Sequence, residues 1–198
     1  MCACSSKVLL FVYVETPVMF IILEERSKDK VAIEFLLDDV FGATRHDKAS
    51  YAFRVESHPV PGLSFSAHCG ERLVGTIRFW LISLGHKKTP ALLMGPLGVA
   101  PDMRGYGVGR NLIFQGHIKA AEMGHELVLL VGAKAYYSRF GYVPARPHGL
   151  VMPGEDPTRL LVCELRKNAL KDASGTLQGG EHPQPCVIGS KIVNQASY

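Results

Sequence analysis

Three glycines at alternate positions stand between two arginines in the segment RGYGVGR, residues 104–110. Glycine loses more conformational freedom on folding than any other residue, so such a run needs a compensating reason. An apolar segment precedes the run and a helical pattern follows it, which places the glycines at the start of a helix. The first amides of a helix have no partner within it and bind phosphate readily. On the residues alone, a phosphate-binding loop and a simple tight turn are equally open.

Two common types of phosphate loop do not match this segment. The nucleoside triphosphate loop requires GxxxxGK[ST], whereas Gly109 is followed by Arg110 and Asn111. A dinucleotide-binding fold places its glycine loop after the first strand of an alternating βα series, with an acidic residue at the end of the next strand. Here the loop comes late, and the next apolar run ends in LVGAKAYY. Both interpretations are therefore disfavoured.

The elements around the loop follow from hydrophobic patterns. Strands are expected at 19–25, 63–69, 73–82, 91–99 and 126–132, helices at 27–42 and 108–123, and a loop with a short helix at 43–54. Gly70 and Glu71 join two of the strands into an antiparallel hairpin. Gly95 and Pro96 interrupt the next strand, which indicates a bulge or an edge. The apolar run that follows the second helix is typical of a buried parallel strand, so this part forms a βαβ unit.

The composition limits the classes of function. The chain has 198 residues, 47% hydrophobic and 20% charged, and a net charge of +4 without a long basic run, so no nucleic-acid partner is expected. Its five cysteines are odd in number and scattered, which predicts neither a disulfide framework nor a metal site and favours the cytoplasm. The apolar run 8–14 is short and is followed by Glu15 and Pro17, so we expect no membrane association.

One folded domain is expected at residues 19–170. Residues 1–18 are interpreted as an N-terminal extension. Residues 171–198 are rich in Gly, Ser, Gln and Pro and are predicted to form a flexible C-terminal tail. Within this tail, residues 186–193 have the composition of a further strand, for which the sequence offers no partner.

The segment 104–109 resembles the [RQ]-x-x-G-x-[GA] acetyl-CoA loop of the GNAT N-acetyltransferase superfamily, in its YhbS-like branch. Two flanking segments strengthen the resemblance. GPLGVAPDM (95–103) is similar to the bulged strand beside the pantetheine arm, and YSRFGY (137–142) is similar to the Tyr-x-x-x-Gly-aromatic signature. The resemblance covers about 19–170. It departs from the branch at Gly132-Ala133-Lys134, where that pattern reads Gly-Asp-Pro, so the loop beside Tyr137 is expected to differ in shape or charge.

The resemblance implies an α/β (α+β) fold: a mixed, mostly antiparallel central sheet with helices on both faces and a splayed parallel strand pair at the acyl-CoA site. It implies acetyl-CoA (coenzyme A) as the acyl-donor cosubstrate and no metal. The residues expected to bind this cosubstrate lie on the bulged strand and in the glycine loop: Leu97, Gly98, Val99, Arg104, Gly105, Tyr106, Gly107, Val108, Gly109 and Arg110.

The implied reaction moves an acetyl group from acetyl-CoA to a primary amine of a small molecule or protein, by direct attack in a ternary complex. Tyr137 is the expected general acid for the thiolate leaving group, and a packing role for it stays open. Ordinary pKa values of about 10 for tyrosine and about 8.5 for a thiol make this proton transfer uphill by about 2 kcal/mol. No general base is evident. His46, His58, His68 and His86 are weak candidates, and water is an alternative.

The basic segment 43–54 is expected to overhang the site and to favour an acceptor that carries a carboxylate or phosphate. Its cationic side chains are Arg45, His46, Lys48 and Arg54. An ordinary solvated loop is the alternative. Residues 149–161 are expected to form a closing hairpin that contacts the substrate. A non-catalytic CoA-binding sensor or scaffold is the rival function, and both a monomer and a homodimer stay open.

Overall fold

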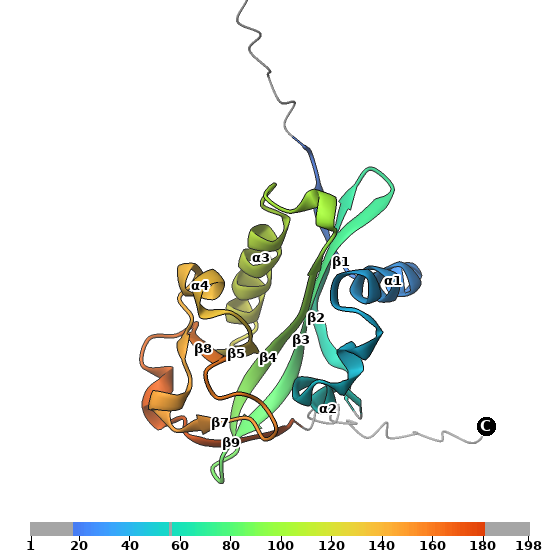
Figure 1. The fold of residues 1–198 in the computed structure, drawn as a ribbon. Coiled ribbons are helices and arrows are strands. Elements are labelled where there is room, and N and C mark those ends of the chain that lie inside the picture. Colours follow the sequence, from blue (N-terminus) through green and yellow to red (C-terminus); the bar gives the residue numbers. More distant parts are fainter. Residues whose placement is uncertain (1–17, 56, 181–198) are drawn as a thin grey trace, which may run out of the picture.

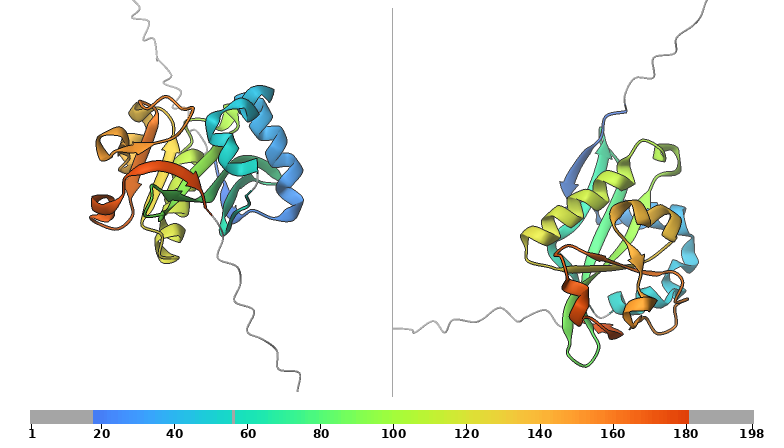
Figure 2. Two further views of the ribbon diagram at one scale, coloured as in Figure 1. Left: turned by 90° about the horizontal axis from the view of Figure 1, so that it is seen from below. Right: turned by 90° about the vertical axis from the view of Figure 1, so that its left-hand side faces the viewer.

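The computed structural model describes residues 18–55 and 57–180. The expected extension, apart from Val18, and the expected strand at 186–193 lie outside the described residues. A single sheet forms the middle of the molecule, with α1 and α2 on one face and α3 and α4 on the other (Figure 1). The view from below separates blue α1 from the orange C-terminal segments by the green strands (Figure 2). The predicted mixed α/β architecture with helices on both faces is confirmed.

Seven strands follow one another across the sheet in the order β1-β2-β3-β4-β5-β8-β6. Their bounds are β1 Ile21–Glu24, β2 Pro59–Cys69, β3 Arg72–Leu84, β4 Thr89–Val99, β5 Leu127–Val131, β8 Leu160–Glu164 and β6 Val143–Pro144. Along this path only β4 and β5 pair in parallel, and the other neighbours are antiparallel. The predicted β2–β3 hairpin and the parallel strand after the second helix are both confirmed.

α1, α2 and α3 occupy the expected segments, whereas α4 was not predicted. The helices are α1 Lys30–Phe41, α2 Ala49–Val55, α3 Val108–Glu122 and α4 Lys134–Tyr137, with 3₁₀ turns at Ser27–Asp29, Ala43–Asp47, Pro101–Met103, Ser138–Phe140, Arg146–His148 and Ala169–Asp172. In the described part of the chain, no helix is both long and apolar enough to cross a bilayer.

β4 carries a bulge and separates from its parallel neighbour. In its pairing with β3, Leu97 lies opposite Ile77 and Met94 lies opposite Phe79, so Gly95 and Pro96 have only one residue across from them. β4 is an inner strand, so of the two expectations the bulge is confirmed and the edge is not. The pairing with β5 covers only Leu92 and Leu93, although β4 continues to Val99. The two strands therefore splay, as expected, and one backbone edge of β4 faces the gap.

The segment after Leu170 differs in part from the predicted flexible tail. Residues Gly175–Gly179 form β9, which pairs antiparallel with the end of β3 and parallel with β7 (Leu150–Val151). Leu177 lies opposite Leu84 and is 2% exposed. A single apolar side chain in a polar stretch is a weak strand signal. The strand exists because β3 extends far enough to pair with it.

α3 packs directly on β3 because Gly116 leaves room for the ring of Phe79. A Cβ at position 116 would lie 2.4 Å from two carbons of this ring, and Phe79 is fully buried. The close approach fixes the distance between α3 and the sheet, and with it the position of the glycine loop that opens the helix.

Replacing Gly116 by Ala should therefore destabilise the protein. Alanine favours a helix over glycine by about 1 kcal/mol, but forcing a methyl group into a filled core costs about 1–3 kcal/mol. The two effects leave a net loss of up to about 2 kcal/mol, and we expect the free energy of unfolding in urea to fall by about 1 kcal/mol. Gln115→Ala, at the exposed neighbouring position, is the matched control and should stay within about 0.5 kcal/mol of wild type. Equal stabilities of the two variants would contradict the close packing.

Candidate active site

Two cavities meet where β4 separates from β5. The inner cavity, about 250 Å³, is lined by the segment from Phe41 to Arg54, the β4 bulge, the end of β5 and the β7–β8 loop. The loop cavity, about 620 Å³, lies along the glycine loop and α4. Phe41, Leu97 and Tyr137 line both cavities and form the wall between them. The strand separation thus creates one site with two compartments.

The structure brings most of the predicted cosubstrate-binding residues together. Leu97, Val99 and every residue from Arg104 to Arg110 line the loop cavity. Gly98 does not line it. Its Cα faces α1, where an added Cβ would lie 2.9 Å from Leu37. Gly98 therefore allows α1 to approach the sheet, and the residues on either side of it in β4 face the cavity.

The glycine loop presents an uninterrupted series of unpaired amides. Among the described residues, none of the amides from Gly105 to Arg110 donates to a backbone or side-chain acceptor. Gly105 and Gly107 have φ values of +88° and +85°, which side-chain-bearing residues rarely adopt. The amide and side chain of Asn111 both donate to the carbonyl of Gly107, at 3.0 and 2.9 Å. The loop is thereby held open at the positive end of α3, a geometry that suits an anion.

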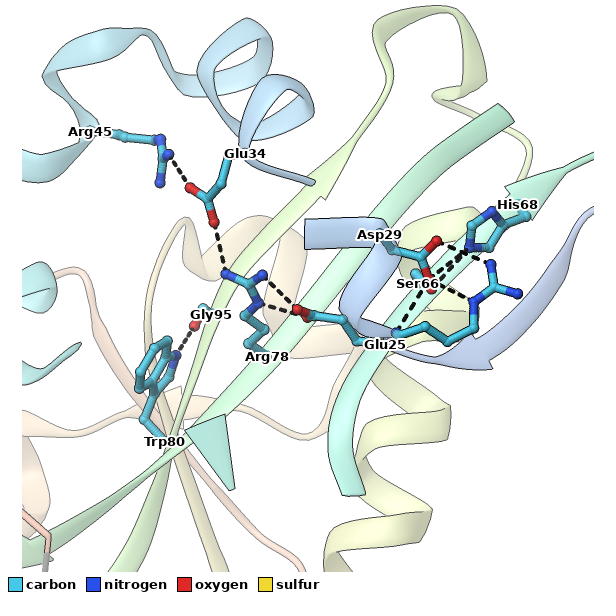
Figure 3. A network of polar contacts seen from close by, with 10 residues as sticks. Glu25, Asp29, Glu34, Arg45, Ser66, His68, Arg78, Trp80 and Gly95 are labelled. Atoms are coloured by element: carbon cyan, nitrogen blue, oxygen red, sulfur yellow. Dashed lines mark hydrogen bonds and ion pairs between the residues drawn. The ribbon is translucent and has the colours of Figure 1, made fainter. Parts of the chain in front are cut away.

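An indole hydrogen bond fixes the bulge of β4. Trp80 Nε1 donates to the carbonyl oxygen of Gly95 at 2.6 Å, and Trp80 is 7% exposed (Figure 3). Gly95 has φ of +130°, which again requires glycine. The bulge is therefore a defined feature of the buried sheet. Sequence analysis located it from Gly95 and Pro96 but did not identify Trp80 as its partner.

Tyr137 lies against the end of β5. A Cβ at Gly132 would be 2.3 Å from the Tyr137 ring, so glycine at that position makes space for the phenol. Tyr136 and Tyr142 contact the ring edge-on, with centroids 4.9 and 5.8 Å away. Burial raises the pKa of Tyr137 to about 12, and its hydroxyl bonds to no described residue. The phenol is therefore protonated at neutral pH and borders both cavities.

Tyr142, the second aromatic residue of the signature, is a core anchor. It is 1% exposed, and its hydroxyl lies 2.8 Å from His117 Nε2 and donates to Met94 Sδ at 3.4 Å. Burial lowers the pKa of His117 to about 4, so its ring is neutral, and the ring tautomer sets which of the two groups donates. These contacts tie the segment after α4 to α3 and β4 and so hold Tyr137 in place.

The predicted basic segment divides into residues with carboxylate partners and residues without. Arg45 bonds to Asp38 and to Glu34. Figure 3 shows Glu34 between Arg45 and Arg78, from which it also accepts a hydrogen bond. Lys48 and Arg54 also line the inner cavity and have no carboxylate partner among the described residues. His46 lies outside both cavities.

None of the four histidines considered as a base lines either cavity. His68 is buried in β2 beside Ser66, with Nε2 and Oγ 3.0 Å apart. Instead, the inner cavity receives Glu155 and Arg159 from the β7–β8 loop, paired at 3.7 Å. The expected hairpin at 149–161 does not form, because β7 pairs with β9 and β8 pairs with β5 and β6. Nothing in the sequence singled out these two side chains. In the described chain, no three His, Cys, Asp or Glu side chains gather as metal ligands.

Comparison with known proteins identifies the family. A family model described as an acetyltransferase (GNAT) domain matches residues 25–145. The chain belongs to the GNAT acetyltransferase family. The uncharacterized N-acetyltransferase YhbS of Escherichia coli K12 is 28% identical over 156 residues, 78% of this chain and 92% of the relative. The E. coli protein YjhQ, named in the same way, is 35% identical over 111 residues, 54% of this chain and 61% of the relative.

Solved structures of GNAT proteins have the same fold. The crystal structure of E. coli YhbS in complex with CoA superposes with a TM-score of 0.73 at 26% identity, covering 85% of this chain and 93% of that one. A GNAT acetyltransferase from Brucella melitensis in complex with acetyl-CoA gives 0.62 at 20% identity, covering 81% and 95%, and supports the fold alone. The predicted family and fold are confirmed.

The raised pKa of Tyr137 makes a prediction about stability at high pH. Between about pH 10 and pH 12 the unfolded chain loses this proton while the folded protein keeps it, so folding loses stability as pH rises. Removing the hydroxyl removes the effect. Between pH 9 and pH 11, Tyr137→Phe should lose about 1 kcal/mol less unfolding free energy than wild type, measured in urea. Tyr106→Phe, which removes an exposed hydroxyl, is the control and should behave as wild type.

Proposed function

We propose that this protein is an N-acetyltransferase that moves an acetyl group from acetyl-CoA to a primary amine of a small molecule or protein. The observation that carries the proposal is the series of unpaired amides from Gly105 to Arg110, which lines the loop cavity. The loop cavity meets the inner cavity at Tyr137. The loop cavity suits the coenzyme, and the inner cavity suits the acceptor. The CoA and acetyl-CoA complexes of related GNAT structures support this assignment.

In the proposed complex the diphosphate of the coenzyme accepts hydrogen bonds from the loop amides. Arg104 and Arg110 are exposed at the two ends of the loop and add positive charge there. The pantetheine arm follows the free edge of β4 near Leu97 and Val99. On this side β4 no longer pairs with β5, so its backbone groups are available to the arm. The thioester then reaches the wall between the two cavities, at Leu97 and Tyr137.

The reaction needs a neutral amine in the inner cavity. Its nitrogen attacks the thioester carbon, and a C–N bond forms as the carbonyl oxygen becomes an oxyanion, which backbone amides of β4 stabilise. Collapse of this intermediate breaks the C–S bond, and the thiolate takes a proton from Tyr137. The proton released by the nitrogen leaves through water, and the phenolate is reprotonated from solvent. Holding the two reactants in line supplies a large part of the acceleration.

Burial of Tyr137 affects its suitability as an acid in two ways. A pKa of about 12 keeps the proton in place until the thiolate forms. Against a thiol in water, with a pKa of about 8.5, the transfer is uphill by about 5 kcal/mol, more than ordinary tyrosine acidity implies. The same dry surroundings raise the pKa of a thiol bound beside Tyr137. The transfer is therefore balanced only while the site excludes water.

Removing the two arginines that flank the loop tests where the coenzyme binds. Exposed ion pairs contribute up to about 1 kcal/mol each, so Arg104→Gln/Arg110→Gln should weaken CoA binding roughly tenfold by titration calorimetry. The loss should shrink at high salt, because exposed charges are screened. The control is Arg146→Gln, which removes an exposed charge outside both cavities. If the double variant bound CoA as wild type does, the proposed position of the diphosphate would be wrong.

Removing the Tyr137 hydroxyl tests the chemistry. With acetyl-CoA and a panel of primary amines, Tyr137→Phe should lower kcat for thiol release about 100-fold, while calorimetry shows unchanged CoA affinity. The loss in kcat should lessen as pH rises above the pKa of the leaving thiol, because the thiolate then needs no proton. Wild-type protein that binds CoA but releases no thiol with any amine would instead be the non-catalytic sensor or scaffold.

A further inference from the structure

Arg54, at the end of α2, is a half-buried cation that has no carboxylate partner among the described residues. Its Nε is wholly buried and bonds to no described residue. The guanidinium carbon lies 6.0 Å from the ring centroids of both Tyr51 and Trp80. These cation–π contacts orient the group but do not neutralise it. Nη2 lies 3.1 Å from the position that a Cβ on Gly95 would occupy, so the guanidinium touches the β4 bulge.

The neighbouring arginines have the partners that Arg54 lacks. Arg78 bonds to Glu25 through two atoms at 2.7 Å each and to Glu34 at 3.1 Å. Arg45 takes the other oxygen of Glu34 and an oxygen of Asp38. Glu25, Glu34 and Asp38 are thus engaged by these two arginines, and Glu24, which also lines the outer hollow beside Arg54, is exposed.

Burial, together with the like charges of Arg45 and Arg78, lowers the pKa of Arg54 to about 10. The group is still a cation at neutral pH, and a buried charge without a partner is costly. Such a residue is expected where a ligand supplies the missing charge.

The surroundings of Arg54 favour an anion in the inner cavity. Arg159 is paired with Glu155 there, and Lys48 stands 5.0 Å above the Phe41 ring. Lys48 and Arg54 are therefore the lining cations without a carboxylate partner among the described residues. The other side of Arg54 borders an outer hollow, where the carboxylate of Glu25 is occupied by Arg78. A planar guanidinium fork matches the oxygens of a carboxylate or phosphate.

We propose that Arg54 binds a carboxylate or phosphate group on the amine acceptor and thereby selects anionic amines. The amine part of this inference rests on the proposed function, whereas the anion site rests on Arg54 itself. Because the guanidinium touches the bulge at Gly95, the anionic group binds close to the proposed reacting centre. The acceptor class is therefore a short amine whose nitrogen and negative group are a few bonds apart.

Matched amines test this selection. Each anionic amine is compared with a neutral counterpart: 3-aminopropanoate with 3-aminopropanamide, and 2-aminoethyl phosphate with 2-methoxyethylamine. In wild type, kcat/KM for thiol release should favour the anionic member of at least one pair by tenfold or more, and the preferred pair distinguishes carboxylate from phosphate. Arg54→Met should abolish the preference by lowering kcat/KM for the anionic amine to about that of its neutral counterpart. Arg54→Lys keeps the charge but loses the fork and should retain only part of the preference.

Thermal unfolding separates the anion site from the transfer reaction. Without acetyl-CoA, 3-aminopropanoate or 2-aminoethyl phosphate should raise the melting temperature of wild type and of the control Arg146→Gln, but not of Arg54→Met. If no amine is acetylated but this difference persists, the proposed function fails and the Arg54 site stands. If the neutral amines react and stabilise as well as the anionic ones in wild type, the Arg54 proposal is overturned and the proposed function stands.

The stability of the free protein distinguishes a ligand-binding role from a structural one. Methionine has a similar length without a charge, so Arg54→Met should melt at the same or a higher temperature than wild type, because an uncompensated buried cation is removed. If Arg54 instead supported the fold through Tyr51 and Trp80, the variant would melt several degrees lower. That result would also overturn the proposal.

Discussion

The separation of β4 from β5 is the constraint on which the site depends. Two register positions of parallel pairing hold the strands together at Leu92 and Leu93, and the bulge at Gly95 directs β4 away. The indole of Trp80 holds that bulge from the buried side. Without the separation, β5 would pair with the free edge of β4, and both cavities would close. A buried hydrogen bond to one carbonyl thus fixes where the two cavities of the candidate site open.

A network of ion pairs between side chains holds the helices that lie over this opening. Glu34 of α1 joins Arg45, which follows α1, to Arg78 of β3, and Glu25 completes the chain of contacts (Figure 3). The network attaches the first helices to the sheet beside the bulge. Two arginines of this region therefore serve the architecture, and their pairing uses up the local carboxylates. Arg54 differs from them because it has no carboxylate partner among the residues that the structure describes.

Local signals in the sequence were sufficient for the elements from β1 to β5 and for the position of the glycine loop, whereas the overall fold was implied by the family resemblance. Glycine spacing, a proline within a strand and an unbroken apolar run each act over a few residues, and the structure confirms the elements they predicted. The sequence did not reveal which arginine is neutralised, because the pairing of Arg78 with Glu25 joins residues 53 apart. It also missed β9, since the partner of that strand is the far end of β3. Glu155 and Arg159 reach the inner cavity only through the path of the β7–β8 loop.

The wall shared by the two cavities couples the size of the donor to the size of the acceptor. Phe41, Leu97 and Tyr137 are the boundary on both sides. Under the proposed arrangement, each methylene added to the acyl chain extends past this boundary into the inner cavity of 250 Å³. It therefore reduces the volume that is left for the amine. A trade-off between acyl length and acceptor bulk is thus built into the geometry. The residues at the boundary, more than those in the glycine loop, would determine this trade-off.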